Sequence, residues 1–333
     1  MTSDPKNPPL GKTASSLARL YAPQIKGKAV LTTGVSPSGL GAVFITAIAK
    51  SEPSLLILAG RNVAKIQETV QTLVAETSDS PVAIRILELD ISSLDAVRNA
   101  ANTVNGWTDI PHIDVVVSNA GIMAVDYKVS PEGHESQFAT NHLGPFLFTN
   151  LIMGKVLASP APRIVMVSSN GHRLCPIRFH DYNFQGGETY NKWQAYGQSK
   201  TANMLMAVSL AQKLGSKNRL LSFSLHPGVI LTNLGAHLDW KTAFPLMNEL
   251  DRFLGNREAQ MTSLPLITPE EGAATYVFAA FDPDLSTHNG SYLTKCGVAD
   301  PWVDTLKPWA TSSVEAERLW KLSEELVGQE FVY

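Results

Sequence analysis

The sequence has little of what disulfide-stabilised or membrane-spanning proteins need. Its 333 residues include two cysteines, Cys175 and Cys296, in no metal-binding or redox spacing, which favours reduced thiols in the cytoplasm. No apolar run approaches the roughly 18 residues that would cross a bilayer, and the polar, proline-bearing N-terminus lacks the apolar core of a signal peptide. We therefore expect a cytoplasmic protein without a transmembrane segment.

Charge of one sign is not concentrated anywhere in the chain. The 27 basic and 30 acidic residues leave a net charge of −3 without a basic run, so we expect no nucleic-acid partner. His172, His180 and His226 lack the spacing of metal ligands, and we expect no metal site. With 44% hydrophobic and 17% charged residues, the composition is that of a globular protein.

What the sequence does contain is an alternation of short apolar runs with longer segments of helical spacing. The runs are rich in Val, Ile and Leu without polar alternation, as in strands covered on both faces. Such alternation predicts an α/β protein with a doubly wound, parallel (Rossmann) sheet whose ligands bind at the carboxyl edge. The expected strands are 28–33, 54–59, 83–89, 114–118, 163–168, 220–225 and 291–294, and the expected helices include 41–51, 63–76, 94–105, 134–157, 196–214, 269–281 and 313–326.

The domain organisation follows from where this alternation starts and loosens. Residues 1–24 form a polar lead-in for which we predict no regular structure, and residues 25–300 form one domain. Within it, residues 229–268 are irregular and aromatic-rich, which is typical of a substrate lid or of a contact in a homo-oligomer. Residues 301–333 are a predicted C-terminal helical extension.

A glycine-rich turn between the first strand and helix is the first candidate site. Glycines let a backbone turn sharply and approach a pyrophosphate, and the free N–H groups at a helix start attract its charge. A plain structural turn is the alternative. The candidate contacts are Gly34, Ser36, Ser38, Gly39, Leu40 and Gly41.

The second strand ends in Gly60, Arg61 and Asn62, where NAD-preferring sites place an acidic residue. Arg61 suits a 2′-phosphate, and Ser38 adds a hydroxyl donor, so NADP(H) is the expected cofactor and NAD(H) the alternative. Arg61 read alone would be a solvated surface residue.

Two later strand ends supply further candidates. Asp90 can accept a hydrogen bond from an adenine amino group, or it caps the following helix. In Asn119-Ala120-Gly121, the glycine permits close approach of a ligand and the asparagine is expected mainly to tie strand ends together.

The most specific signal is Tyr196 with Lys200, an i,i+4 pair on one helix face. Carbonyl reduction needs a proton donor, and a neighbouring ammonium is expected to lower the pKa of the phenol from about 10. Ser169 ends the preceding strand, where its hydroxyl can polarise a carbonyl, and Asn141 can hold a water that relays protons through Lys200. A nucleophilic serine is disfavoured because no G-x-S-x-G elbow surrounds these serines.

Together these motifs resemble the short-chain dehydrogenase/reductase family over residues 26–330, most closely its retinol-dehydrogenase-like and fungal branches. The resemblance implies a seven-stranded parallel sheet, an Asn141/Ser169/Tyr196/Lys200 tetrad, and a nicotinamide carboxamide near Val229 and Thr232. Four residues instead of the family's three separate Gly34 from Gly39. The residues that carry the resemblance are Thr33, Gly34, Gly39, Gly41, Asn119, Ala120, Gly121, Asn141, Ser169, Tyr196, Lys200, Pro227, Gly228 and Thr232.

The expected function is NADP(H)-dependent interconversion of a ketone or aldehyde and an alcohol on a fairly apolar small molecule, with secondary-metabolite biosynthesis as a setting. NAD-dependent alcohol oxidation and a non-catalytic nucleotide-binding scaffold or redox sensor remain the alternatives.

Overall fold

The fold is built on one sheet. The structure, a computed structural model, describes residues 12–77 and 81–333. Its eight strands are ordered β3-β2-β1-β4-β5-β6-β7-β8, and the first seven in sequence run parallel. This confirms the predicted doubly wound α/β class. The strands are β1 (Ala29–Thr33), β2 (Leu55–Gly60), β3 (Ile84–Glu88), β4 (Val115–Ser118), β5 (Arg163–Val167), β6 (Leu221–His226), β7 (Tyr292–Thr294) and β8 (Gly297–Val298).

The strand count differs from the predicted seven by one. The two-residue strand β8 pairs antiparallel with β7. Lys295 and Cys296 connect them with φ of 50° and 55°, as a tight hairpin turn requires. Two residues are too few to carry a periodic signal, so the sequence offered nothing that would mark this strand.

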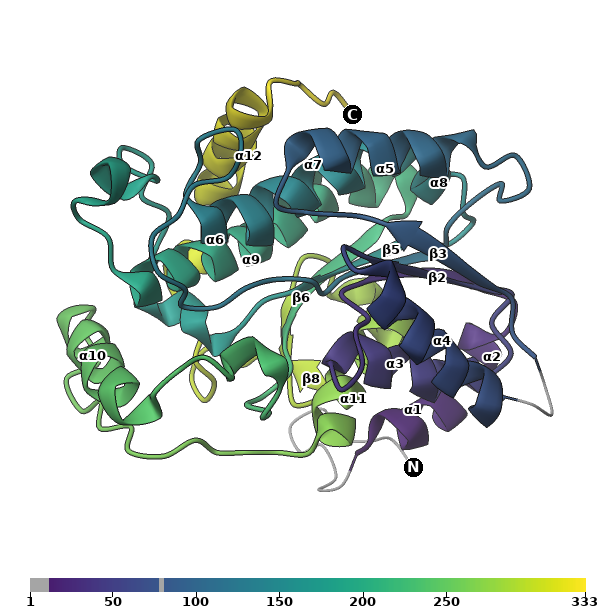
Figure 1. Cartoon of the computed structure of the whole chain (residues 1–333), viewed down its shortest axis with the longest axis horizontal. Helices are drawn as coiled ribbons and strands as arrows, with labels where there is room; N and C mark the ends of the chain where they lie inside the picture. Colours follow the sequence, from purple (N-terminus) through teal and green to yellow (C-terminus); the bar gives the residue numbers. More distant parts are fainter. Residues whose placement is uncertain (1–11, 78–80) are drawn as a thin grey trace.

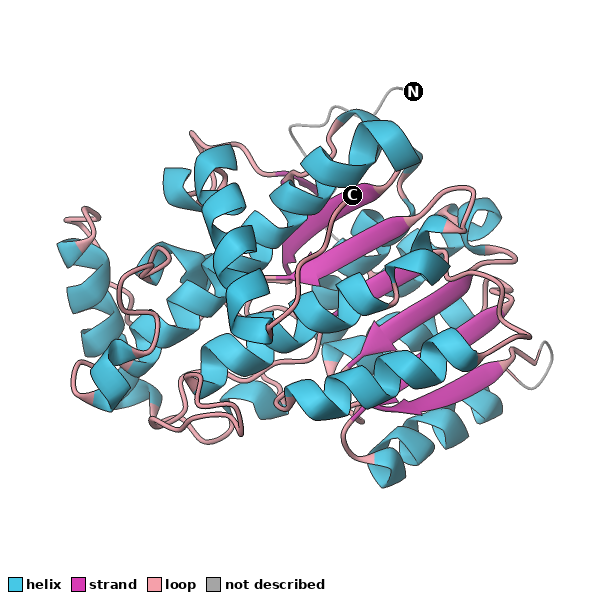
Figure 2. Ribbon diagram, turned by 90° about the horizontal axis from the view of Figure 1, so that it is seen from above, coloured by secondary structure: helices cyan, strands magenta, loops and turns pink. Residues whose placement is uncertain are grey.

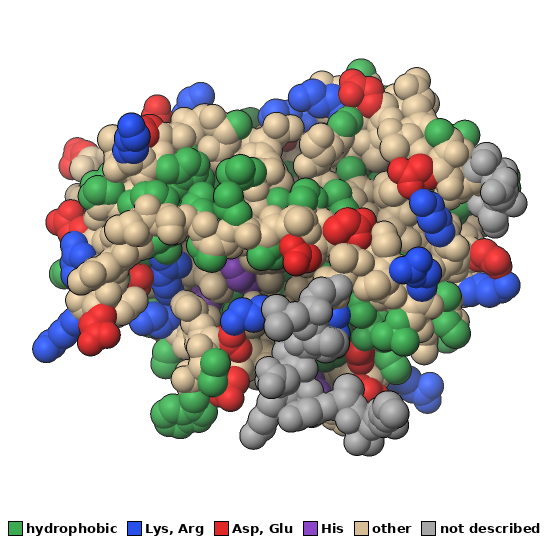
Figure 3. All heavy atoms as spheres, turned by 90° about the horizontal axis from the view of Figure 1, so that it is seen from below, with side chains coloured by type: hydrophobic (Ala, Val, Ile, Leu, Met, Phe, Trp, Pro, Cys, Tyr) green, Lys and Arg blue, Asp and Glu red, His purple; other side chains and the backbone are tan. Residues whose placement is uncertain are grey.

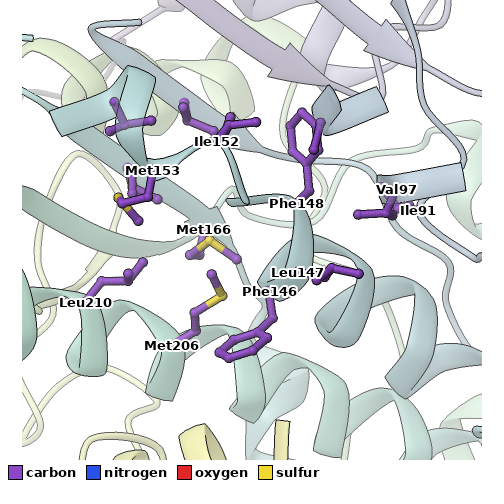
Figure 4. Close-up of a cluster of buried hydrophobic side chains, with 14 of the residues drawn as sticks. Ile91, Val97, Phe146, Leu147, Phe148, Ile152, Met153, Met166, Met206 and Leu210 are labelled. Atoms are coloured by element: carbon purple, nitrogen blue, oxygen red, sulfur yellow. The ribbon is translucent and has the colours of Figure 1, made fainter. Parts of the chain in front are cut away.

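Helices cover both faces of the sheet (Figures 1 and 2). One face packs on α5 (Leu94–Gly106), α7 (Gly144–Leu151), α8 (Met153–Leu157), α9 (Lys192–Asn218) and α12 (Ser313–Val327). Figure 4 shows part of this apolar layer, where Met166 of β5 faces Phe146 and Met206. The other face packs on α1 (Ala14–Leu20), α2 (Ala22–Ile25), α3 (Leu40–Ala49), α4 (Val63–Glu76) and α11 (Pro269–Phe281).

The prediction that the lead-in, residues 1–24, has no regular structure is wrong for its described part, which contains α1 and the start of α2. Thr13 caps α1 in a reciprocal capping box with Ser16, and Leu17 is buried. The Ser15 N–H and hydroxyl both donate to the Glu270 carboxylate at the start of α11. A helix of seven residues is only marginally stable by itself. Its stability therefore comes from these tertiary contacts, which cannot be predicted from the local sequence. Residues 1–11 lie outside the described residues.

The segment 229–268 was predicted to be irregular, and this too is wrong in part. It contains α10 (Trp240–Phe253), which buries Ala243, Met247 and Leu250 at helical spacing. Asp239 caps its first turn, and Pro245 lies inside the helix, where proline normally argues against helix. Figure 1 shows α10 set apart from the helices that flank the sheet.

The predicted helix 134–157 is interrupted. It divides into α6 (Ser136–Phe138), a π-helical turn η1 (Ala139–Leu143), α7 and α8. A Cβ at Gly144 would lie 2.1 Å from the Ile91 carbonyl oxygen, so only glycine lets α7 approach that backbone. The π-helical turn carries Asn141, one of the expected site residues.

The surface agrees with the balanced composition. Acidic and basic side chains are interspersed on the face seen in Figure 3. Within residues 12–77 and 81–333, no helix has the length and apolarity needed to span a bilayer. The same residues contain no group of three His, Cys, Asp or Glu side chains placed to hold a metal ion.

Candidate active site

A cleft of about 1320 Å³ opens at the carboxyl edge of the sheet. It is lined by the segments that follow β1 to β6 and by residues of α10 and its flanks. This is the edge where doubly wound sheets bind ligands. Of the predicted site residues, the lining includes Gly34, Ser36, Ser38, Gly39, Leu40, Arg61, Asn62, Asp90, Asn119, Ala120, Gly121, Ser169, Tyr196, Lys200, Pro227, Gly228, Val229 and Thr232.

The glycine turn forms a tight cradle at one end of the cleft. Gly34 has a φ of 72°, and a Cβ at Gly41 would lie 2.6 Å from the Gly34 carbonyl oxygen. The helix that follows, α3, has Gly39 as its N-cap and therefore no side chain to satisfy its first N–H groups. These open donors and the close backbone fit the pyrophosphate of a dinucleotide.

The extra residue in this turn is accommodated locally. Ser38 takes a left-handed φ of 63°, and the Gly39 N–H donates to the Ser36 carbonyl at 3.1 Å. The additional residue therefore closes a small turn before the helix, and it leaves the start of α3 facing the cleft.

Exposed cations lie beside this cradle. Arg61 follows β2 and is exposed at the cleft wall, with no acidic residue at this strand end. Lys65, which sequence reasoning missed, also lines the cleft from the first turn of α4. The signal was available, since Lys65 stands four residues after Arg61. The Asn62 side chain accepts from the Lys65 N–H at 3.0 Å and caps α4.

The Asp90 carboxylate does not cap a helix, so that alternative is wrong. Ser93 is the N-cap of α5, and Asp90 instead accepts from the Ser92 N–H at 3.0 Å and hydroxyl at 2.6 Å. The bend that these two bonds hold leaves Asp90 at the cleft.

Asn119 joins three elements with its amide. Its Nδ2 donates to the carbonyl oxygens of Thr33 and Gly34 at 2.8 and 2.9 Å, and its Oδ1 accepts from the Tyr276 hydroxyl at 2.8 Å. A Cβ at Gly34 would lie 2.8 Å from the Ala120 Cα. The strand ends β1 and β4 are thus held together beneath the cradle.

The Tyr196 ring lies against the backbone that follows β5. A Cβ at Gly171 would lie 2.7 Å from Tyr196 Cε1. Ser169 forms a side-chain hydrogen bond with Tyr196 and also accepts from the Gly171 N–H at 3.0 Å. The neighbouring Ser168 donates to the Lys200 carbonyl and is turned away from this chemistry.

The acid–base properties of the pair differ from the sequence prediction. Burial raises the pKa of Tyr196 to about 12, and the Ser169 hydrogen bond only partly offsets this. Burial lowers the pKa of Lys200 to about 8. Lys200 Nζ donates to the Val167 carbonyl at 3.2 Å and lies 5.6 Å from the Tyr196 ring centroid. The pKa of Tyr196 therefore shifts in the direction opposite to the predicted lowering, because burial dominates, and Lys200 is not among the groups that shift it.

Asn141, on η1, is buried behind the cleft wall and does not itself line the cleft. Its Oδ1 accepts from the Ile122 N–H at 2.8 Å, and its Nδ2 donates to the Ile122 carbonyl and the Ser199 hydroxyl, each at 2.9 Å. Both of its N–H donors are thus committed, and the predicted water relay stays a prediction. Gly121 permits this arrangement, since a Cβ there would lie 2.8 Å from Asn141 Oδ1.

The segment after β6 closes one side of the cleft. Gly228 has a φ of 95°, and the Val229 carbonyl accepts from the Ile267 N–H at 3.0 Å. Thr232 caps a short 3-10 turn, Asn233–Gly235. Pro227 lies between these residues and His226 at the end of β6.

Beyond the tetrad, the cleft becomes an apolar chamber. Trp193 of α9 and Trp240 of α10 have ring centroids 6.3 Å apart. Trp193 stands three residues before Tyr196, a spacing that places both on one helix face and would have revealed it. The apolar chamber is lined by Met123, Leu174, Trp193, Leu238, Trp240, Met247 and Met261, which pack together as one hydrophobic cluster.

A doubly wound sheet, a dinucleotide cradle and a Ser-Tyr-Lys group at one edge define the class of nucleotide-dependent oxidoreductases. Residues 28–242 match the short chain dehydrogenase family. The chain is 33% identical to mouse retinol dehydrogenase 14, over 91% of this chain and 86% of that protein. It is also 33% identical to the short-chain dehydrogenase/reductase prx1 of Penicillium rubens, over 90% and 84% of the two chains.

Among solved structures, an uncharacterized protein from Mycobacterium paratuberculosis superposes with a TM-score of 0.68 at 29% identity, over 94% of this chain and 98% of that one. The chain belongs to the short-chain dehydrogenase family. It is an NAD(P)-dependent oxidoreductase that acts on CH–OH groups, with a nicotinamide dinucleotide as its cofactor.

Proposed function

We propose that this protein is an NADP(H)-dependent carbonyl reductase that interconverts an aldehyde or ketone and its alcohol on a fairly apolar small molecule. The observation that carries the proposal is the place of Tyr196 and Ser169, which line the cleft between the glycine cradle and the tryptophan-lined chamber. A carbonyl at this junction would have its apolar body in the chamber.

Tyr196, Ser169 and Lys200 each have a separate role in the proposed reaction. When bound, the nicotinamide group supplies or accepts the hydride. Tyr196 donates its hydroxyl proton to the developing alkoxide, and Ser169 donates a hydrogen bond to the same oxygen. Lys200 contributes positive charge that favours the tyrosinate left behind. Oxidation of an alcohol is the same set of steps in reverse, so NAD(P)-dependent alcohol oxidation is the second candidate.

Tyr196→Phe tests the proton-donating role. We expect it to lower turnover of every accepted carbonyl by about 100-fold or more, since general acid catalysis is worth roughly 10²–10⁴. The assay follows NADPH consumption with a panel of apolar aldehydes and ketones, and tryptophan fluorescence reports NADPH binding separately. Turnover at the wild-type rate would show that Tyr196 is not the proton donor.

The preference for NADP(H) rests on the two cations at the end of β2. Arg61 and Lys65 provide guanidinium and ammonium donors where an acidic residue would repel a 2′-phosphate. We expect Arg61→Ala to weaken NADPH binding about 10-fold, as loss of a charge-assisted hydrogen bond does, with little effect on NADH. Equal weakening of both cofactors would remove Arg61 from this role.

The apolar substrate is supported by the chamber and by the retinol dehydrogenases among the relatives. We therefore include retinal and retinol in the substrate panel. Secondary-metabolite biosynthesis, a cytoplasmic location and a homo-oligomer stay predictions. Cofactor binding without turnover across the whole panel would favour the alternative of a nucleotide-binding scaffold or redox sensor.

A further inference from the structure

His172 is a fully buried histidine next to the proposed catalytic serine. It lies on the 3-10 turn Asn170–Leu174, three residues after Ser169, with 0% of its surface exposed. Its Nδ1 is 2.8 Å from the Ser169 carbonyl oxygen, and its Nε2 is 3.3 Å from the Lys307 backbone nitrogen. The imidazole therefore joins the end of β5 to a segment 135 residues further along the chain.

These two partners fix the tautomer of the ring. The Lys307 N–H can only donate, so Nε2 accepts and Nδ1 carries the proton that is donated to Ser169. Burial is the main cause that lowers the pKa of His172 to about 4; the hydrogen bond to the Ser169 carbonyl opposes it, and the charges of Arg173 and Lys307 add to it. The imidazole is thus neutral at pH 7, with one nitrogen committed to each partner.

The backbone around His172 is held as firmly as the ring. Its carbonyl oxygen accepts from the Thr201 hydroxyl at 3.1 Å, one residue after Lys200, and from the Trp309 indole N–H at 3.2 Å. Its ring meets the Tyr292 ring edge-on at 5.3 Å. The Tyr292 hydroxyl in turn donates to Asn170 Oδ1 at 3.0 Å. Asn170 and Gly171 lie between Ser169 and His172 in the chain, and the backbone of Gly171 lies against the Tyr196 ring.

We propose that His172 is a positioning residue, through which the C-terminal segment 307–309 holds Ser169 at the distance from Tyr196 that carbonyl polarisation needs. The inference rests on the proposed function, since it assigns a purpose to Ser169. It also gives segment 307–309 a part in catalysis, because the Lys307 N–H and the Trp309 indole both hydrogen-bond His172. A purely structural histidine would fill the same space without requiring either nitrogen in particular.

Three variants separate the two nitrogens. His172→Asn keeps a donor near the Nδ1 position and loses the acceptor, His172→Gln keeps an acceptor near the Nε2 position and loses the donor, and His172→Phe loses both. We expect His172→Phe to lower kcat about 10- to 100-fold, the range for a misplaced reacting group, with KM and NADPH affinity unchanged. His172→Asn recovers most of kcat, and His172→Gln recovers the thermal unfolding midpoint but not kcat.

The inference is overturned if His172→Phe keeps the wild-type kcat, or if Asn and Gln restore kcat equally. If His172→Phe does not fold, the Asn and Gln pair decides alone. ¹⁵N spectra of the histidine-labelled protein at pH 7 provide a readout without turnover, in which the His172 proton is expected on Nδ1; a proton on Nε2 contradicts the geometry. His288→Gln, at an exposed histidine outside this network, is the matched control and should keep the wild-type kcat.

Ser169→Ala, measured beside these variants, separates the two claims. If Ser169→Ala keeps the wild-type kcat, the proposed function of Ser169 is wrong. If Ser169→Ala loses activity and His172→Phe does not, the proposed function stands and the positioning role of His172 is wrong.

Discussion

Gly171 shows how much of the site depends on one missing methyl group. A Cβ there would lie 2.7 Å from Cε1 and 2.9 Å from Cδ1 of the buried Tyr196 ring. Gly171→Ala is therefore expected to displace Tyr196, to lower kcat, and to cost about 1–3 kcal/mol of unfolding free energy, as overpacking does. Urea unfolding and the carbonyl assay measure both.

The matched control is Gly154→Ala in α8, where a Cβ would meet nothing within 4 Å. This exposed helical site should gain up to about 1 kcal/mol of stability and leave kcat alone. An equally harmless Gly171→Ala would contradict the close contact with Tyr196.

For single residues, the sequence predicted which side chains form the site better than it predicted their pKa values. Spacing alone brought Ser169, Tyr196 and Lys200 to one sheet edge, where the structure has them. It failed for the pKa of Tyr196, because the size of a desolvation effect depends on how completely residues distant in sequence bury the phenol. It missed Lys65 and Trp193, whose roles depend on the path of the chain after β2 and on where α10 lies.

At the level of secondary structure, an ion pair joins α10 to the turn that follows Ser169. Arg173 Nε donates to Asp251 Oδ2 at 2.9 Å, and the two side chains are 13% and 6% exposed. Arg173 Nη1 also donates to the Asn170 carbonyl, one residue after Ser169. The pair therefore couples the helix that covers the apolar chamber to the turn that carries the serine.

Removing one partner leaves the other charge buried, so Asp251→Ala should cost about 3 kcal/mol. We expect α10 to loosen, substrate KM to rise, and proteolytic cleavage near residues 254–262 to become faster, while NADPH affinity stays the same. Glu249→Gln, an exposed position on the same helix, is the control. If the KM values of Asp251→Ala and wild type agree, the Arg173–Asp251 ion pair does not hold α10 in place over the apolar chamber.

The elements that the sequence mispredicted share a cause. The central strands and flanking helices were recognised because their apolar patterns are long, whereas α10 has a proline inside it and buries a stripe of only three apolar residues. The π-helical turn η1 falls within an otherwise regular apolar pattern, and Gly144, which permits contact with Ile91, has no local signature. The conformation of these segments depends on tertiary contacts, which a local sequence pattern does not contain.

For the molecule as a whole, three buried histidines predict acid lability. Burial lowers the pKa of His142, His172 and His226 to about 3, 4 and 3, against about 6.5 in an unfolded chain. Between these values the unfolded state binds more protons, so stability falls as the pH drops from about 6.5 towards 4. The raised pKa of the buried Glu135 acts in the opposite direction and offsets part of this loss.

Urea unfolding at pH 7 and pH 5.5 should differ by roughly 1 kcal/mol for each buried histidine. His172→Asn should remove its share of the difference, and exposed His288→Gln is the control. Equal stability at both pH values would mean that these histidines can be protonated in the folded protein.

One single-turnover experiment tests the cofactor cradle, the proton donor and the apolar chamber together. Enzyme saturated with NADPH is mixed with an accepted apolar aldehyde, and NADPH oxidation and alcohol formation are followed for wild type, Ser169→Ala and Tyr196→Phe. We predict equal NADPH binding in all three and one alcohol formed per NADPH oxidised by wild type. In Tyr196→Phe the rate should fall about 100-fold or more. Hydride transfer at the wild-type rate in Tyr196→Phe would show that Tyr196 does not donate the proton in carbonyl reduction.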